Sequence, residues 1–365
     1  MRYVFISYNY SPDFLTPESW FKRTEGYAGL MECLSKENTV ISVKQINYEG
    51  DHTHNGIQYR FVNFYRKKVY LSRRINQYIK NLQPDIVVVQ GLHHPLQIVQ
   101  LGLLLNKNTK IIAHHHAEKP LIGIKRYAQK LADKFVDAYL FASKPMGLDW
   151  VKKGNLASPQ KIHEVMEVSS NFHPVDKAQA KEKTGVAGNP VFLWVGRLNA
   201  NKDPLNVVKA FFKFAETNPD ARLYMIYHTG ELLVEITSVI DNHPQKNSII
   251  LIGKVVHDDL LYWFNSADFF ISGSHYEGSG TAVCEAMSCR CVPVVTDIFS
   301  FRMITDNGNC GLLYEAGNEA ALLGALEETG RLNVKEKQEL SLKQFREKLS
   351  FEAIAAQVHQ IASSL

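Results

Sequence analysis

The chain has 365 residues, of which 45% are hydrophobic and 21% charged, and these proportions are typical of globular rather than disordered or fibrous proteins. A single core stops growing at roughly 250 to 300 residues, so the length predicts two domains. With 41 basic against 37 acidic residues, the net charge of +4 is too small for wholesale nucleic-acid binding. No apolar run approaches the roughly 20 residues that a membrane span needs, and we expect a cytoplasmic protein.

Nine short apolar runs rich in Val, Ile and Phe recur along the chain, each followed by a stretch of helical period. They lie at 3–7, 85–90, 110–113, 138–143, 191–195, 221–227, 248–252, 268–272 and 292–296. This alternation predicts an α/β fold with parallel sheets covered by helices on both faces. Ligands of such sheets bind outside the carboxyl ends of the strands, so the chemistry is expected in the loops that follow strands.

The runs fall into two sets, separated by the polar segment 169–174 with its helix-breaking proline. We therefore expect a first domain at 1–170 and a second at 171–349. Residues 334–365 have helical spacing, and the terminal stretch 350–365 is a candidate for completing the first domain. The five cysteines are odd in number and match neither a disulfide framework nor a paired zinc motif, so we expect reduced, mostly buried thiols.

A strand, a turn of small residues and a helix are predicted over 269–287. The turn consists of Gly278, Ser279, Gly280 and Thr281. A helix start with free backbone N–H groups suits a phosphate, whereas the carboxylates of Glu277 and Glu285 suit the hydroxyls of a sugar or a ribose. The alternative is that one acidic residue favours the helix dipole and the other is a solvated surface side chain.

A second strand and turn occupy 194–204, where Arg197 and Lys202 place two cations on a loop that could receive a diphosphate. Solvated loop cations are the alternative. The motifs VGRLNANKDP at 195–204 and SHYEGSGTAVCEAMSCRCVPVV at 274–295 resemble the GT-B glycosyltransferases of family 4, a retaining group. The spacing of Glu277 and Glu285 is similar to the E-x7-E element of that family. Residues 250–255 and 309–314 also resemble it, and the likeness covers most of 190–325.

The resemblance implies a GT-B fold, in which two doubly wound Rossmann-like domains face each other across a cleft. Arg197 and Lys202 would bind the donor diphosphate and stabilise the leaving nucleotide, without a metal or another cofactor. Glu285 would hold the ribose and Glu277 the transferred sugar, with the backbone of 278–281 near the diphosphate. Backbone groups of Gly253, Lys254 and Val255 would recognise the base of a UDP- or GDP-linked sugar. Transfer would take place on the donor's own face, and the leaving phosphate would take the proton of the acceptor.

Three histidines, His114, His115 and His116, end the predicted strand at 110–113. The resemblance implies one catalytic histidine near the anomeric carbon, and the best register places it at His116. Strand alternation points His114 and His116 to one side and His115 to the other. Two alternatives remain, a structural pair and a zinc site completed by the side chains Glu118, His93 and His94.

The chain departs from the family pattern in three places. Residues 9–14 replace a Gly-Gly loop after the first strand, and Arg290 stands where glycine is frequent. The segment 298–302 replaces Gly-Gly-x-Pro-Glu, and Arg302 is a candidate for an additional phosphate or sugar contact.

The segment 66–80 is basic and amphipathic and carries no acidic residue. Its cations are Arg66, Lys67, Lys68, Arg73, Arg74 and Lys80. Such a segment predicts either peripheral contact with an anionic membrane at its inner face or a surface helix whose apolar stripe packs on the sheet.

The sequence thus predicts a metal-independent, retaining hexosyltransferase. It would move a sugar from a nucleotide diphosphate to a saccharide or lipid-linked acceptor, in the synthesis of a cell-surface polysaccharide or glycolipid. Two alternatives share the architecture: a disaccharide phosphorylase or synthase, and a non-catalytic subunit that binds a nucleotide sugar.

Overall fold

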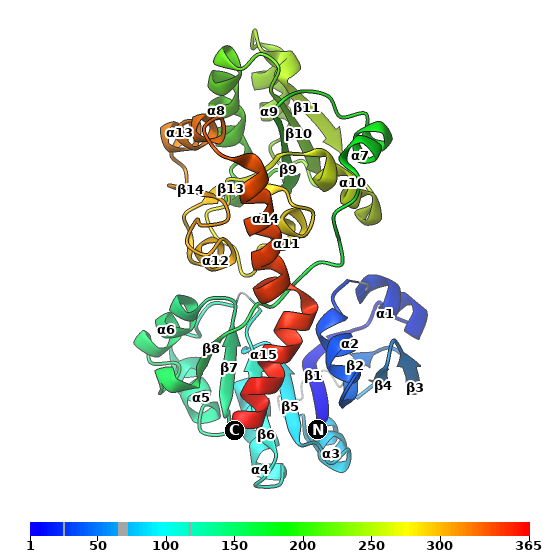
Figure 1. The fold of residues 1–365 in the computed structure, drawn as a ribbon. Coiled ribbons are helices and arrows are strands. Elements are labelled where there is room, and N and C mark those ends of the chain that lie inside the picture. The colour runs from blue at the N-terminus through cyan, green and yellow to red at the C-terminus, as the bar shows by residue number, and fades with distance from the viewer. Residues whose placement is uncertain (25, 65–71, 117) are drawn as a thin grey trace. The chain divides into compact units, whose positions relative to one another are not determined.

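The computed structural model describes residues 1–24, 26–64, 72–116 and 118–365. They divide into unit 1, Met1–Glu167 with Phe351–Leu365, and unit 2, Val168–Ser350. Each unit is a Rossmann-like α/β domain with its own largely parallel sheet and its own buried core (Figure 1). The predicted fold class of two doubly wound α/β domains is therefore confirmed.

Unit 1 contains an eight-stranded sheet in the order β3-β4-β2-β1-β5-β6-β7-β8. The strands are β1 (Arg2–Ser11), β2 (Thr39–Ile46), β3 (Gly50–His54), β4 (Ile57–Val62), β5 (Ile86–Gln90), β6 (Lys110–His114), β7 (Ala138–Phe141) and β8 (Ile162–Glu164). β3 runs antiparallel to β4, and the other pairs are parallel. Because β1 is central and strands are added first on one side and then on the other, the sheet is doubly wound.

Helices cover both faces of this sheet (Figure 1). They are α1 (Pro17–Thr24), α2 (Gly29–Ser35), α3 (Arg73–Asn81), α4 (Pro95–Leu104), α5 (Ile124–Ala132), α6 (Lys144–Lys152) and α15 (Phe351–Ser364). Strand β1 alternates between the faces, as the pleat requires. Val4 and Ile6 belong to the core that α3 and α4 cover, whereas the Tyr3 hydroxyl lies on the other face, 2.9 Å from Nδ1 of His359 in α15.

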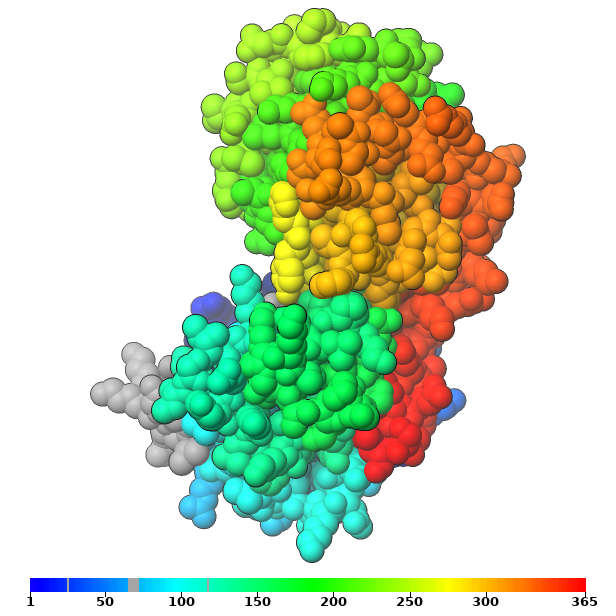
Figure 2. Space-filling view, turned by 90° about the vertical axis from the view of Figure 1, so that its left-hand side faces the viewer, coloured from blue at the N-terminus to red at the C-terminus, as the bar shows by residue number. Residues whose placement is uncertain are grey.

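The C-terminal helix α15 is part of unit 1 although unit 2 precedes it in the sequence. Its Phe351 ring lies against Gly29 of α2, where a Cβ would come within 2.3 Å of the ring, so only glycine leaves room for this contact. Gln357 donates a hydrogen bond from Nε2 to the carbonyl oxygen of Glu164 at 2.7 Å. This red C-terminal segment and the green segment that contains β8 lie side by side on the surface (Figure 2).

Unit 2 contains a six-stranded, wholly parallel sheet in the order β11-β10-β9-β12-β13-β14. Its strands are β9 (Val191–Gly196), β10 (Arg222–Tyr227), β11 (Ile249–Gly253), β12 (Phe269–Ser272), β13 (Val292–Thr296) and β14 (Leu312–Tyr314). Its helices are α7 (Lys177–Thr184), α8 (Pro204–Thr217), α9 (Leu233–Asp241), α10 (Leu260–Ser266), α11 (Thr281–Ser288), α12 (Phe299–Ile304), α13 (Glu319–Thr329) and α14 (Val334–Gln344). Helix α8 packs against α13, and α7 packs against α10 (Figure 1). A π-helical turn at Phe345–Leu349 follows α14.

All nine predicted runs lie on strands. The structure contains five further strands that were not predicted, β2, β3, β4, β8 and β14. The predicted burial of most cysteines is confirmed, since four of the five are buried, and all five are free in the structure. Burial raises the pKa of the Cys289 thiol to about 12, so this thiol stays protonated at neutral pH.

Candidate functional site

The two motif loops of unit 2 follow the neighbouring strands β9 and β12. The chain adds β10 and β11 on one side of β9, then returns to add β12, β13 and β14 on the other side. Between β9 and β12 the order of strands reverses, and such a switch point opens a crevice at the carboxyl ends of the strands. The structure therefore brings together the loops that carry Arg197, Lys202 and Glu277.

Backbone contacts join these two loops. The backbone N–H of His275 donates to the carbonyl of Asn201 at 2.8 Å, and Nδ2 of Asn201 donates to the carbonyl of Tyr276 at 3.0 Å. At Gly273 a Cβ would lie 3.0 Å from the carbonyl oxygen of Lys202, so the close approach of the loops depends on glycine. The two motifs thus form one structural element although some 80 residues separate them.

The loop after β9 ends in a sharp turn at Asp203. Asp203 has a φ of 43°, in the left-handed region, and precedes Pro204, the first residue of α8. A residue before proline avoids the right-handed helical region, and proline is favoured at a helix start. The Asp203 carboxylate lies 3.3 Å from Nε2 of His275, which ties this turn to the second loop.

The side chains of Lys202 and Glu277 form an ion pair at the switch point. Their side chains are only 21% and 16% exposed. The Arg197 side chain is exposed, and among the described residues its guanidinium has no hydrogen-bond or ion-pair partner. The site therefore offers one cation that a carboxylate already neutralises and one cation that is free to meet an anionic ligand.

Helix α11 begins beside this pair. Gly280, its N-cap, has a φ of 61°, and a Cβ at this position would lie 2.8 Å from Cε1 of Phe301. Glycine is thus required both by the backbone conformation and by the space. The first N–H groups of a helix have no acceptor within the helix, so the turn Gly278–Ser279–Gly280–Thr281 supplies donors and a positive dipole end to the crevice.

Glu285 is buried at 5% exposure on α11 and contacts a residue that the sequence analysis did not select. Its Oε1 lies 2.8 Å from Nε2 of His257. The centre of the His257 ring lies 5.1 Å from the centre of the Phe172 ring. His257 begins the short turn after the loop formed by Gly253, Lys254 and Val255, and Gly253 has a φ of 83°. His257 therefore connects the predicted base-recognition loop to the predicted ribose ligand, although no motif marks it.

The two arginines that depart from the family pattern both have carboxylate partners. Arg302 forms a bidentate ion pair with Asp297, in which Nη2 of Arg302 lies 2.6 Å from Oδ2 of Asp297. This pair holds the pKa of the Asp297 carboxyl below its usual range. Arg290 has a φ of 61°, a conformation that suits glycine, and its Nε lies 3.1 Å from Glu339. A phosphate at Arg302 would have to compete with Asp297.

Unit 1 contains a cavity of about 730 Å³ at the carboxyl ends of β1, β2, β5 and β6. The order of strands reverses between β1 and β5, so the cavity lies at the switch point of this sheet. It is lined by Ser7, Asn9, Ser11, Trp20, Lys44, Gln45, Gln90, Gly91, His93, His94, His116 and Glu118. Asn9 and Ser11 belong to residues 9–14, which stand where the family pattern has a Gly-Gly loop, and both line this cavity at the end of β1.

Of the three adjacent histidines, His116 lines the cavity. Its Nδ1 pairs with Glu167, and its Nε2 lies 2.8 Å from Oε1 of Gln90. The predicted alternation is confirmed. The ring centres of His114 and His116 lie 5.0 Å apart, whereas the ring centre of His115 lies 4.6 Å from that of Phe141. Burial lowers the pKa of His114 to about 3, and neither of its ring nitrogens has a partner among the described residues.

Glu118 and Glu167 hold the histidines of this cluster by hydrogen bonds, a role that was not predicted for either residue. Glu118 accepts the backbone N–H of Leu92 at 2.8 Å and that of His116 at 2.6 Å, so it joins the loops after β5 and β6. The zinc alternative finds no support, since among residues 1–24, 26–64, 72–116 and 118–365 no group of three or more His, Cys, Asp or Glu is arranged to hold a metal ion.

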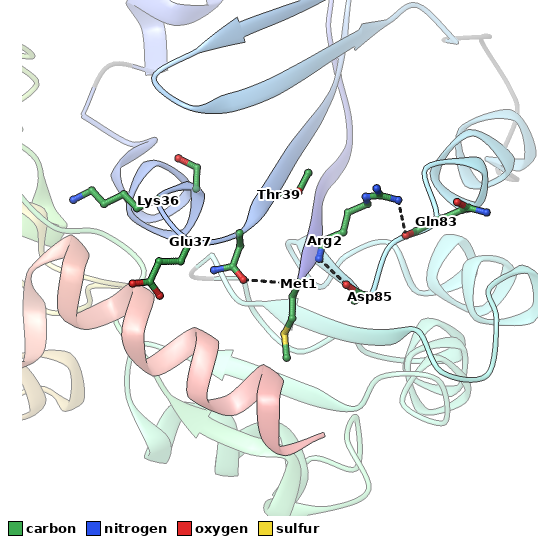
Figure 3. A pocket seen from close by; sticks show the side chains of 9 residues that line it. Met1, Arg2, Lys36, Glu37, Thr39, Gln83 and Asp85 are labelled. Carbon is green, nitrogen blue, oxygen red and sulfur yellow. Dashed lines mark hydrogen bonds between the residues drawn. The ribbon is translucent and has the colours of Figure 1, made fainter.

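A second polar cavity of unit 1, of about 640 Å³, lies at the opposite, amino-terminal edge of the sheet (Figure 3). Its groups bond to one another. The Met1 amino group donates to Oδ1 of Asn38 at 3.1 Å, and the backbone N–H of Arg2 donates to Asp85 at 2.7 Å. The Arg2 guanidinium donates to the carbonyl of Leu82 at 3.2 Å. These bonds, at the edge away from the carboxyl ends, indicate a structural role.

The basic segment 66–80 is only partly described, since residues 65–71, with Arg66, Lys67 and Lys68, lie outside the described residues. Helix α3 covers the rest. Ile75 and Ile79 are 2% and 0% exposed and belong to the core of unit 1, whereas Arg73 and Arg74 are exposed. The apolar side of α3 is therefore buried in the core of unit 1. No helix in the described part of the chain has the length and apolar character to cross a membrane.

Comparison with known proteins finds similarity over part of the chain. Residues 176–343 match the family model "Glycosyl transferases group 1". Poly(glycerol-phosphate) alpha-glucosyltransferase of Bacillus subtilis is 33% identical over 118 residues, which are 32% of this chain and 17% of that protein. Mannosylfructose-phosphate synthase of Agrobacterium fabrum is 28% identical over 137 residues, which are 35% of this chain and 30% of that protein. The chain thus matches less than a third of the length of these relatives.

Solved structures are similar over the whole chain. A glycosyltransferase from Rickettsia africae has a TM-score of 0.77 at 17% identity, covering 100% of this chain and 97% of that chain. Anabaena Alr3699/HepE, solved in complex with UDP, has a TM-score of 0.73 at 14% identity, with 100% of both chains covered. At these identities the similarity shows the fold alone, and that fold is the GT-B fold predicted from the sequence.

Proposed function

We propose that the protein is a retaining, metal-independent glycosyltransferase. It moves a hexosyl group from a UDP- or GDP-linked sugar to a saccharide or lipid-linked acceptor, in the synthesis of a cell-surface polysaccharide or glycolipid at the cytoplasmic side of the membrane. The group 1 family domain at 176–343 supports a transferase, and so do the names of the relatives, which include a glucosyltransferase and a sugar-phosphate synthase.

One observation carries the proposal: the switch point of unit 2 joins two cations, two carboxylates and a helix start. In our proposal Arg197 and the N–H groups at the start of α11 bind the diphosphate, and Lys202 stabilises the charge of the leaving nucleotide. Glu277 positions Lys202 and accepts hydrogen bonds from the sugar hydroxyls. Glu285, oriented by His257, accepts those of the ribose. Each well-placed donor to a developing oxyanion contributes a few kcal/mol.

The proposed reaction needs no protein nucleophile. The acceptor oxygen forms a bond to the anomeric carbon on the face that the diphosphate leaves, and the anomeric C–O bond breaks. The proton of the acceptor hydroxyl passes to the leaving phosphate oxygen. His116, which Glu167 and Gln90 hold in unit 1, is the catalytic histidine of this proposal. Because Lys202 and Arg197 supply positive charge to the leaving group, no metal is needed for this step.

The experiment that tests this function is thermal stabilisation of the purified protein by UDP, GDP, ADP, dTDP and their common sugars, with a chelator present. A ligand that binds only the native state raises its stability according to affinity and concentration. We expect a shift with UDP or GDP that survives the chelator, followed by sugar transfer with that donor. A disaccharide phosphorylase would require free phosphate or a free sugar as co-substrate. Binding without turnover would identify a non-catalytic subunit.

Contact with an anionic membrane is a separate part of the proposal. In the segment 66–80, for which the sequence predicts this contact, exposed Arg73 and Arg74 support it. Around α5 the support is stronger, because Ile122 and Ile124 are 84% and 85% exposed and Tyr127 is 65% exposed. The exposed cations there are Lys125, Arg126, Lys130 and Lys134. Exposed apolar side chains among cations are typical of a surface that binds anionic lipid.

Flotation with vesicles of phosphatidylglycerol and phosphatidylcholine tests this contact. We expect binding that weakens as salt is raised, is lost on I122D/I124D and is reduced on R73Q/R74Q if α3 contributes. A wild-type protein that does not float at low salt would exclude the membrane contact without affecting the proposed transfer.

A further inference from the structure

The cavity of unit 1 contains one cation that no described residue neutralises. Lys44 lies at the carboxyl end of β2 and lines the cavity, and among the described residues it has no ion pair and no hydrogen bond. Its ammonium instead lies 5.4 Å from the centre of the Trp20 ring. A partly buried cation without a counter-charge is costly, so such a residue indicates a ligand that is not part of the chain.

The backbone around Lys44 is shaped to make room. Strands β1 and β2 pair regularly up to Ile6 with Val43 and resume at Tyr10 with Gln45. Three residues of β1 thus stand opposite Lys44 alone. Bulges of this kind occur beside active sites, where they redirect side chains. Here the bulge carries Ser7 and Asn9, both of which line the cavity.

Trp20 supplies a second unsatisfied donor to the same wall. Its indole Nε1 is buried and has no acceptor among the described residues, although buried indole N–H groups usually find one. An ammonium and an indole N–H that both lack an acceptor point to an oxyanion.

No described carboxylate forms an ion pair with Lys44. The Glu118 carboxylate already accepts two backbone N–H groups, and Glu167 pairs with His116. Burial alone lowers the pKa of Lys44 to about 8, with no contribution from a neighbouring carboxylate. Both Lys44 and His116 line the cavity, and of the two only His116 has a carboxylate partner among the described residues.

We propose that Lys44 and Trp20 bind a phosphate or carboxylate group of the acceptor, so that the protein glycosylates an anionic acceptor. That the bound anion belongs to an acceptor rests on the proposed function, whereas the anion site itself does not depend on that function. The volume of about 730 Å³ is in the range of small-molecule sites and suits a sugar phosphate or a uronic acid.

Calorimetric titration with inorganic phosphate, glucose 6-phosphate and glucuronate, each with saturating UDP or GDP present, tests the inference. We expect saturable binding of at least one anion, about 10- to 100-fold weaker in Lys44→Gln, as for the loss of one charge-assisted hydrogen bond. Lys44→Arg should stay within a few-fold of wild type, because it keeps the charge. Lys152→Gln, an exposed lysine on α6, is the matched control. Thermal unfolding of each variant shows that it is folded.

Three results would overturn the inference: no saturable anion binding to the wild type, equal binding to Lys44→Gln, or binding lost only in Lys202→Ala, which would place the anion in unit 2. A Lys44 that acts as a general base predicts that Lys44→Arg loses transfer as fully as Lys44→Gln while both bind the anions normally. If the anions bind but no nucleotide does, the anion site stands and the proposed function fails. If nucleotides bind and sugar is transferred without anion binding, the proposed function stands and the anion site is excluded.

Discussion

The switch points of the two units differ in how their charges are satisfied. In unit 2, Lys202 faces Glu277 and Glu285 faces His257, so most of the charged side chains hold one another. In unit 1, Lys44 lacks a counter-charge, and the ring nitrogens of His114 lack partners among the described residues. The charged side chains of unit 2 thus form a site organised by its own residues, whereas the cavity of unit 1 contains groups without partners. Under the proposed function, the preorganised site would bind the donor and the unpaired groups would bind the acceptor.

The largest effect should come from the carboxylate of unit 2. Glu277→Ala removes both the proposed sugar contact and the counter-charge of Lys202, so kcat should fall about 100- to 1000-fold while nucleotide affinity is largely kept. Steady-state transfer and calorimetry with UDP or GDP measure the two quantities. Glu182→Ala, an exposed glutamate on α7, is the control. Full activity of the Glu277 variant would remove this residue from the mechanism.

The cation of the same pair should have a smaller effect, on binding. Lys202→Ala should weaken nucleoside diphosphate binding about 10- to 100-fold, the range of one hydrogen bond to a charged group. Because Lys202 contacts Glu277, the double variant should show less than the sum of the two single losses. Lys209→Ala on the exposed side of α8 should bind like wild type. Unchanged affinity of the Lys202 variant would show that this cation is a structural partner of Glu277 only.

The left-handed glycine before α11 should set the stability of the donor loop. Gly280→Ala places a Cβ near Phe301 at a φ of 61° and should reduce the free energy of unfolding by about 1 to 3 kcal/mol. Gly324→Ala on α13 is a matched control: no heavy atom lies within 4 Å of its added Cβ, so it should raise helix stability by roughly 0.5 to 1 kcal/mol. Thermal melts of both variants decide this, and equal melting temperatures would contradict the strain argument.

The histidines of unit 1 should affect the free energy of unfolding least at neutral pH and more strongly in acid. In the folded state the pKa of His114 is about 3, against about 6.5 in an unfolded chain, so only the unfolded chain takes up this proton between these values. The stability of unit 1 is therefore complete above about pH 6.5 and falls on acidification, by about 2 kcal/mol at pH 5 for this residue. Burial lowers the pKa of His94 and His115 too, in the same direction.

Denaturant unfolding at pH 7 and pH 5 measures this loss. His114→Leu should flatten the pH dependence, while His228→Leu, an exposed histidine of unit 2, should leave it unchanged. A His114 variant as acid-sensitive as wild type would show that other groups control acid stability.

The same contrast explains what the sequence could predict. The residues that we propose for the donor stand in two continuous motifs, so local pattern sufficed to select Arg197, Lys202 and Glu277 and to expect strands and helices around them. Lys44, Trp20, Glu118 and Glu167 come from separate elements and share no motif, and only the strand order brings three of them to one cavity. His257 was missed for the same reason.

The missed strands have a local explanation. β3 and β4 form an antiparallel hairpin through Asn55-Gly56, whose φ values are 47° and 80°. The Asn-Gly pair is a strong signal for a two-residue hairpin turn, so this hairpin was predictable from the sequence. β8 and β14 have three residues each, too few for a periodic pattern, and pairing with β7 and β13 defines them.

Helix α15 has a consequence for biosynthesis. Unit 1 begins with the first residue of the chain but needs Phe351–Ser364 to cover Tyr3 and Gly29, and a ribosome makes these residues only after all of unit 2. Domains generally fold as the chain emerges. Unit 2 can therefore finish its fold while unit 1 still exposes an apolar face, so the domain that is synthesised first is the last to be completed.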